Sequence, residues 1–170
     1  MGRLPATFGG RQITARQPQV FNGELVMTSA AQGQQFPDST YLNSTDRPFE
    51  IHRMIPFCVA LDSNGIALPG TVDQDLLCSL IRAKVSDLAK GPTAFMRSST
   101  MLRALVKGSS EFTWEFADPY YLAKSEQLQV ILDALTFPAI TVDDTAMASI
   151  NVSLTFEGFF ISIGPASDVR

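Results

Sequence analysis

The sequence contains a single histidine, and a carboxylate lies two positions before it. In a strand, Glu50, His52 and Met54 would share one face, because side chains alternate with a period of two. Ser–His–acid catalysis needs a nucleophile held against such a base, and a metal site needs several converging ligands. The sequence has no further histidine and no G-x-S-x-G elbow. We therefore predict that His52 is structural, that the chain is not an enzyme, and that it uses no cofactor or metal.

Two cysteines and two acidic pairs are the remaining candidates for chemistry. Cys58 and Cys78 lie in predicted strands without a nucleophile signature, and they can form at most one disulfide bond. Reduced thiols in the core of a protein made in a cytoplasm are the better interpretation. The acidic pairs at positions 73/75 and 143/144 fall in turn-like segments, which indicates solvated turns rather than the two acids of a glycosidase.

The composition limits the classes of protein to which the chain can belong. Its 170 residues make one domain, with 18% charged residues and a formal net charge of −4. Low charge with many Ser, Thr, Gln and Asn side chains suits a surface that other protein partly covers. The negative charge argues against nucleic-acid binding, and no stretch approaches the roughly 18 apolar residues of a membrane span. The N-terminus also lacks the apolar core of a signal peptide.

The clearest structural pattern lies near the C-terminus. Apolar residues occupy every second position from Ile150 to Phe156, with polar residues between them, which is typical of a strand with one face in the core. After Gly158 the apolar positions change phase and run from Phe159 to Ile163. A glycine at a change of phase predicts a β-bulge that redirects a long strand.

Other segments also favour antiparallel strands over alternating βαβ units. Residues 20–29 indicate a strand interrupted by a turn at Asn22-Gly23, and residues 73–90 a short helical turn followed by a strand. Residues 49–61 alternate and end in a turn, and Pro56 within them indicates an edge strand or a bulge. Their apolar face is predicted to comprise Phe49, Ile51, Ile55, Phe57, Val59 and Leu61.

Seven or eight strands with uneven connections predict an all-β fold. We expect a single-domain antiparallel β-sandwich, with a jelly roll favoured because its connections cross between two sheets. The aromatic residues among positions 112–121 are predicted to form a row facing the core. An exposed aromatic platform for carbohydrate is the alternative for these side chains.

The first 20 residues differ from the rest of the chain in charge. They hold three of the 13 basic side chains and none of the 17 acidic ones, and Pro5, Gly9-Gly10 and Pro18 break any periodicity. Such a segment cannot by itself offset the cost of ordering its backbone, about 1–2 kcal/mol per residue. We therefore divide the chain into an extended N-terminal arm, residues 1–20, and a β-sandwich domain, residues 21–170.

The arm is predicted to be mobile in the isolated protein and to become ordered against a partner surface. Arginines would supply salt-sensitive attraction, and apolar side chains would anchor the contact. The candidate contact residues are Arg3, Phe8, Arg11, Ile13, Arg16, Val20 and Phe21.

Four runs of sequence resemble the jelly-roll cement or head-decoration proteins of tailed bacteriophages. They are D-R-P-F-E-I-H-R-M at residues 46–54, L-L-C-S-L-I-R-A-K-V-S-D-L-A-K at 76–90, W-E-F-A-D-P-Y-Y-L at 114–122 and F-E-G-F-F-I-S-I at 156–163. The resemblance implies a virion structural protein, made in the host cytoplasm and placed on the outside of an icosahedral capsid. It also implies binding to the major capsid protein and to copies of itself, as a trimer, with loops and arms that bridge capsomers.

Three other functions remain open. The chain could be a carbohydrate- or receptor-binding β-sandwich module of a virion, or a small jelly-roll shell subunit. A hydrolase or isomerase on a β-barrel is disfavoured by the single histidine. Cementing agrees best with low charge, a basic N-terminal segment and a sequence without a reactive centre, since many modest contacts act together on a multivalent lattice.

Overall fold

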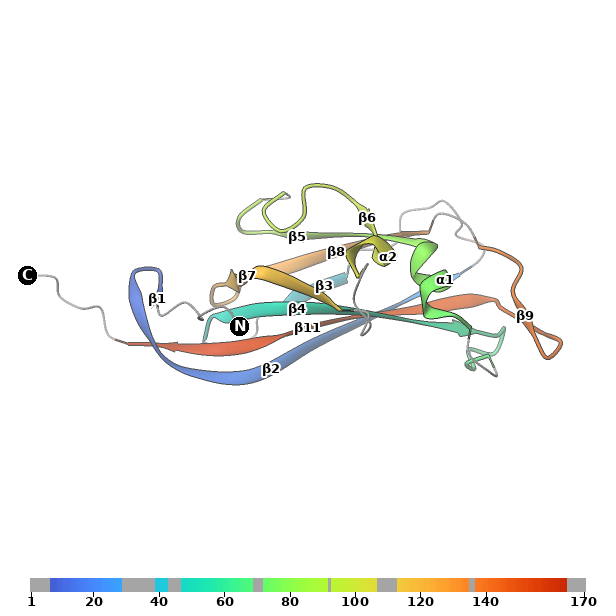
Figure 1. The fold of residues 1–170 in the computed structure, drawn as a ribbon, viewed down its shortest axis with the longest axis horizontal. Helices are drawn as coiled ribbons and strands as arrows, with labels where there is room; N and C mark the ends of the chain where they lie inside the picture. Colours follow the sequence, from blue (N-terminus) through green and yellow to red (C-terminus); the bar gives the residue numbers. More distant parts are fainter. Residues whose placement is uncertain are drawn as a thin grey trace, which may run out of the picture.

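Two antiparallel β-sheets and two short helices make up the fold, in a computed structural model that describes residues 7–28, 39–42, 47–68, 72–91, 93–106, 113–134 and 137–164. In Figure 1 the long ribbons of β2, β4 and β11 run along one side, and those of β5 and β8 run along the other. The prediction of an all-β sandwich is confirmed.

The strands form one large sheet, one smaller sheet and a separate hairpin. The five-stranded sheet has the order β1 (Thr7–Phe8), β2 (Arg11–Thr28), β11 (Ser149–Ile163), β4 (Phe49–Leu61) and β7 (Trp114–Leu122). The four-stranded sheet has the order β3 (Ser39–Leu42), β8 (Gln127–Ala134), β5 (Ile81–Asp87) and β6 (Thr100–Met101). The remaining elements are the hairpin β9 (Thr141–Val142) and β10 (Thr145–Ala146) and the helices α1 (Gln74–Ser79) and α2 (Leu102–Leu105).

The order of the strands is that of a jelly roll. Apart from the two-residue strands, successive strands along the chain alternate between the two sheets. The five-stranded sheet takes β2, β4, β7 and β11, and the four-stranded sheet takes β3, β5 and β8. The first and last long strands, β2 and β11, are neighbours in the same sheet. The orders β2-β11-β4-β7 and β3-β8-β5-β6 therefore build the double-sheet arrangement in which two Greek keys close on each other.

The core lies between the two sheets and follows the predicted alternation. In β11 the even-numbered side chains from Ile150 to Phe156 are at most 1% exposed, and Leu128, Val130 and Leu132 of β8 face them from the other sheet. The aromatic residues Trp114, Phe116 and Tyr120 of β7 are partly buried against the same core. The predicted core-facing aromatic row is thus confirmed for these three residues.

The predicted bulge at Gly158 is present, but its extra residue belongs to the neighbouring strand. Glu157 pairs with Arg53 and Gly158 with Ile51, so His52 of β4 has no partner in β11. The alternation of β11 therefore continues unchanged, and Phe160 follows Phe156 into the core. The expectation that the core face of β11 shifts to odd positions is wrong, because the change of phase occurs in β4.

This bulge reverses the two faces of β4. Phe49 and Ile51 face the core, but after His52 the core positions pass to Met54, Cys58 and Ala60. The prediction that Ile55, Phe57, Val59 and Leu61 share the core face is wrong, as is the prediction that Met54 shares a face with Glu50 and His52. Pro56 pairs with Leu154 of β11 without a register shift, and the residues that would face it beyond Trp114 of β7 lie outside the described ranges. The predicted edge or bulge at this proline therefore stays a prediction.

The N-terminal segment is also different from the expectation. Residues 11–20 belong to β2 and pair with β11 from Ile13 to Val20, so they are a sheet strand and not a loop-like arm. No turn interrupts the strand at Asn22-Gly23, which pair with residues 155 and 154. The cost of ordering this segment is offset by a ladder of hydrogen bonds to a strand that lies more than a hundred residues away. Residues 1–6 lie outside the described ranges.

Other local predictions are confirmed. Residues 73–90 contain a short helix, α1, followed by a strand, β5. Asp73 caps the helix by accepting a hydrogen bond from the Asp75 amide. Asp143 and Asp144 have positive φ angles in the tight turn between β9 and β10, which agrees with the predicted solvated turn.

Candidate interaction surface

The face of the five-stranded sheet that points away from the core carries an unusual set of side chains. We call it the outer sheet face. Cross-strand pairing aligns alternate residues of β2, β11 and β4 on it: Val20, Asn22, Glu24, Val26, Asn151, Ser153, Thr155, Glu157, Arg53, Ile55, Phe57 and Val59.

Large apolar side chains are exposed on both flanks of this face. Val20 and Val26 on β2 are 50% and 52% exposed, and Phe57 on β4 is 54% exposed. The bulge at His52 causes the exposure of Phe57, because it turns the apolar positions that follow away from the core. Apolar side chains gathered on one open sheet face are typical of a surface that another protein covers.

A row of short polar side chains fills the space between the apolar flanks. The Asn22 side-chain oxygen accepts hydrogen bonds from the Ser153 hydroxyl, at 2.7 Å, and from the Thr155 hydroxyl, at 3.0 Å. These bonds cross from β2 to β11 and fix the side chains in place. The centre of the outer sheet face therefore carries uncharged side chains that are already ordered for contact.

A groove of about 810 Å³ opens where this face meets β7. The β7 residues 116–119 form an irregular insertion opposite His52, because Ile51 pairs with Tyr120 and Arg53 with Glu115. The groove is lined by Val20, His52 and Phe159, and by the ion pair of Arg53 with Glu157. It extends the outer sheet face with three charged side chains, Arg53, Glu115 and Glu157, and with the rings of His52, Phe116 and Phe159.

A buried carboxylate supports one end of the groove. Glu50 has no exposed surface, and its two oxygens lie 2.9 Å from Arg16 Nε and 3.0 Å from His52 Nε2. The Tyr121 hydroxyl is buried beside Glu50 and Arg16, and it has hydrogen-bond geometry to neither side chain. Burial raises the pKa of Tyr121, and the charge of Glu50 raises it further. His52 is hydrogen-bonded locally to Glu50, and a structural role for it stays a prediction.

The sheet curls at this end until its two edges touch. The Phe8 ring on β1 lies 5.1 Å from the Tyr121 ring on β7, although these strands are the first and last of the sheet. Ile161 is fully buried on the outer side of β11 in the same region. The curl thus closes a small second core around Glu50, separate from the one between the sheets.

Three predicted contact residues have partners within the molecule. Phe8 packs on Tyr121, and Arg16 binds the Glu50 carboxylate. The Phe21 ring packs edge-on against core aromatic rings of β4 and β11. Because these contacts are internal, these side chains stabilise the sheet.

The other predicted contact residues have different surroundings. Arg3 lies outside the described residues. Ile13 is partly buried, whereas Arg11 is exposed and Val20 is half exposed. Only Val20 of these lies on the outer sheet face. Phe57 and Val26 also lie there, and the sequence patterns did not predict them. One signal could have identified Phe57: in residues 49–61 both the odd-numbered and the even-numbered positions are largely apolar, so one apolar set must face away from the core.

A second polar cluster ties the two sheets together. Asp87 at the end of β5 is fully buried and accepts hydrogen bonds from Lys90 Nζ, at 2.9 Å, and from the Tyr120 hydroxyl, at 2.7 Å. Lys90 Nζ also binds Glu126 at 2.8 Å. Burial alone would raise the pKa of Asp87, but the hydrogen bonds from Lys90, Tyr120 and two backbone amides outweigh it and hold that pKa below its usual value.

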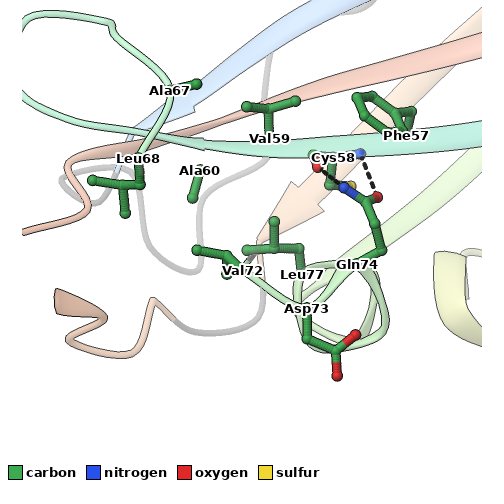
Figure 2. A pocket seen from close by; sticks show the side chains of 10 residues that line it. All are labelled: Phe57, Cys58, Val59, Ala60, Ala67, Leu68, Val72, Asp73, Gln74 and Leu77. Carbon is green, nitrogen blue, oxygen red and sulfur yellow. Dashed lines mark hydrogen bonds between the residues drawn. The ribbon is translucent and has the colours of Figure 1, made fainter. Parts of the chain in front are cut away.

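The two cysteines meet where α1 packs on β4, and Cys58 lines a cavity of about 590 Å³ (Figure 2). Both thiols are buried and unbonded, and their sulfur atoms are 3.8 Å apart. The cavity is lined mainly by apolar side chains of α1 and β4, among them Val59, Ala60 and Leu77. The prediction that Cys58 and Cys78 are core residues is confirmed, but Cys78 lies in the helix α1 and not in a strand as predicted.

In the described part of the chain, no three His, Cys, Asp or Glu side chains are grouped to hold a metal ion. Neither of the two short helices in these ranges is long and apolar enough to cross a membrane. Comparison of the sequence with protein-family models and with curated proteins finds no match.

The pairing of His52 with Glu50 predicts the effect of substitution. His52→Leu removes one of two donors to a buried carboxylate, and we expect the free energy of unfolding to fall by about 1–3 kcal/mol. His52→Gln keeps a hydrogen-bond donor of similar reach, and its free energy of unfolding should fall by less than half as much as that of His52→Leu. Urea denaturation of both variants measures the difference, and equal stability of the two would contradict the proposed role of this contact.

Proposed function

We propose that the protein is a virion structural protein, a cement or decoration subunit that binds the outside of an icosahedral phage capsid and reinforces contacts between capsomers. The observation that carries the proposal is the outer sheet face, where exposed apolar flanks surround a neutral, ordered polar row. The resemblance of four sequence runs to phage decoration proteins supports the same function. The partners are the major capsid protein and further copies of this chain, expected as a trimer.

The chemistry of the outer sheet face suits repeated, modest contacts. Its apolar side chains on the two flanks can be buried in an interface, while Arg53, Glu157 and Glu24 supply charged contacts beside them. A single contact of this kind is weak, but a subunit held at several points on a lattice gains effective concentration at each point. A binding site of this type needs no reactive centre.

The proposal is tested by decoration of capsid shells that lack this protein. Phe57→Glu places a charge at the centre of an apolar flank, and we expect the occupancy of shells to fall at least tenfold at limiting protein concentration, since burial of an unpaired charge costs several kcal/mol. Occupancy is measured by cosedimentation and by electron microscopy of the particles.

Leu88→Glu is the matched control. Leu88 is 50% exposed, close to the value for Phe57, but it lies just after β5 in the four-stranded sheet. This variant should decorate shells like the unmodified protein. Equal loss in both variants would place the contact elsewhere, and failure of the unmodified protein to bind shells would overturn the proposed function.

A further inference from the structure

Two buried thiols meet at the contact between α1 and β4. Cys58 lies in β4 and Cys78 in α1, and neither side chain has exposed surface. Their sulfur atoms are 3.8 Å apart, within hydrogen-bonding distance for sulfur and without a covalent bond. A disulfide bond requires about 2.05 Å, so side-chain rotation and a small shift of the six-residue helix must close the gap.

The helix is held in register with the strand by one side chain. Gln74 at the start of α1 accepts a hydrogen bond from the Cys58 amide at 3.0 Å and donates one to the Cys58 carbonyl. Figure 2 shows this double contact beside the cavity, with Leu77 of the same helix turned toward Ala60 and Val72. The two thiols are therefore positioned against each other in the folded protein. The cavity that Cys58 lines lies next to the pair, so a local opening of the contact between α1 and β4 would admit a small oxidant to Cys78.

The surroundings also make the two thiols unequal. The hydrogen bond between the two thiols lowers the pKa of Cys78, although burial and the nearby Asp75 and Asp73 carboxylates oppose this effect. The same contact raises the pKa of Cys58, and burial raises it further. Cys78 is thus the better thiolate of the pair, and the thiolate is the form that reacts with oxidants.

We propose that Cys58 and Cys78 are a latent disulfide, formed when the protein moves from a reducing to an oxidising medium. Such a move rests on the proposed function, because a capsid protein is made in a cytoplasm and is released with the particle. With a small peroxide as oxidant, the Cys78 thiolate attacks one peroxide oxygen and becomes a sulfenic acid, while the other oxygen leaves as hydroxide. The Cys58 sulfur then displaces the sulfenic hydroxyl, so that one disulfide and one water form.

The bond would fasten α1 to the strand whose outer side forms the proposed contact surface. It would close a loop from residue 58 to residue 78 and so restrict the unfolded chain. For a domain of this size we expect the oxidised protein to unfold at a temperature on the order of 10 °C higher than the reduced protein. The oxidised particle would then keep its decoration under heating better than the reduced one.

The experiment uses the full chain, purified with reductant, freed of it and treated with hydrogen peroxide. We expect the intact mass to fall by about 2 Da, both thiols to become unreactive after denaturation, and dithiothreitol to reverse both changes together with the rise in melting temperature. Cys78→Ser and Cys58→Ser should show no peroxide-dependent stabilisation. Persistence of two free thiols, or a gain of oxygen without the loss of two hydrogens, would overturn the proposal. These readouts involve no capsid, so they are independent of the decoration test.

Discussion

Gly158→Ala is expected to lower the free energy of unfolding by about 3 kcal/mol or more. A Cβ at this position would lie 1.8 Å from the backbone oxygen of Glu50, and neither group can rotate away. The approach is this close because β4 bulges at His52 directly opposite the glycine. Relief of the clash requires the two central strands of the sheet to separate. Chemical denaturation followed by circular dichroism measures the loss.

Gly164→Ala is the matched control for this substitution. Gly164 follows β11, and a Cβ there would meet the Thr14 side-chain methyl at 3.2 Å, which can move by rotation. We expect a change within about 1 kcal/mol. If both alanine variants are equally stable, the bulge is more deformable than the packing at Gly158 indicates.

Lys90→Met is the second substitution with a large expected effect. It leaves the buried Asp87 carboxylate with the Tyr120 hydroxyl and backbone amides alone. Loss of one partner of a fully buried pair costs about 3–5 kcal/mol. Because the Lys90 side chain is 42% exposed, water replaces part of the interaction, and we expect a loss of about 2 kcal/mol. Arg103→Met, which removes an exposed pair with Asp75, should cost less than about 1 kcal/mol.

The same cluster predicts the dependence of stability on pH. The pKa of Asp87 is lowered in the folded protein, so its contribution is present above the pKa of an unfolded aspartate and is lost as the pH falls through the folded value. Burial alone would lower the pKa of Lys90, but Glu126 and Asp87 outweigh it and raise that pKa. The contribution of Lys90 is therefore lost only as the pH rises above the usual lysine value. Urea midpoints measured across pH should show a loss of stability at acidic pH and another at alkaline pH. The Lys90→Met variant should lack the loss at alkaline pH.

Local patterns predict much of this fold. The alternation from Ile150 to Phe156 identifies the core face of the central strand, and residues 49–61 have the same bounds in the sequence pattern and in the structure. The turn after this strand follows from its Asp, Asn and Gly residues. These features depend on neighbours in sequence, and for that reason sequence alone is sufficient for them.

The errors arise where distant strands decide the outcome. Whether His52 pairs or bulges depends on the register of β11 and β7 beside it, and local alternation contains no information about this register. Residues 11–20 are ordered by β11, which a segment-by-segment estimate of order cannot include. The exposure of Phe57 also results from the bulge at His52. A phenylalanine is common both on a core face and on a contact face, so its residue type does not show on which face it lies. The residues of the outer sheet face therefore follow from the strand register, which local sequence patterns do not contain.

The pairing of β2 with β11 also governs when the molecule can form. These strands pair residues 28 and 149 at one end and residues 13 and 163 at the other, so every contact between them closes a loop of more than a hundred residues. Loop closure of this size is slow, and proteins rich in distant contacts fold in milliseconds to seconds. During synthesis β2 and β4 leave the ribosome long before β11, the strand with which both of them pair. The outer sheet face is therefore completed only late in translation, and under the proposed function a nascent chain could not bind a shell before it is folded.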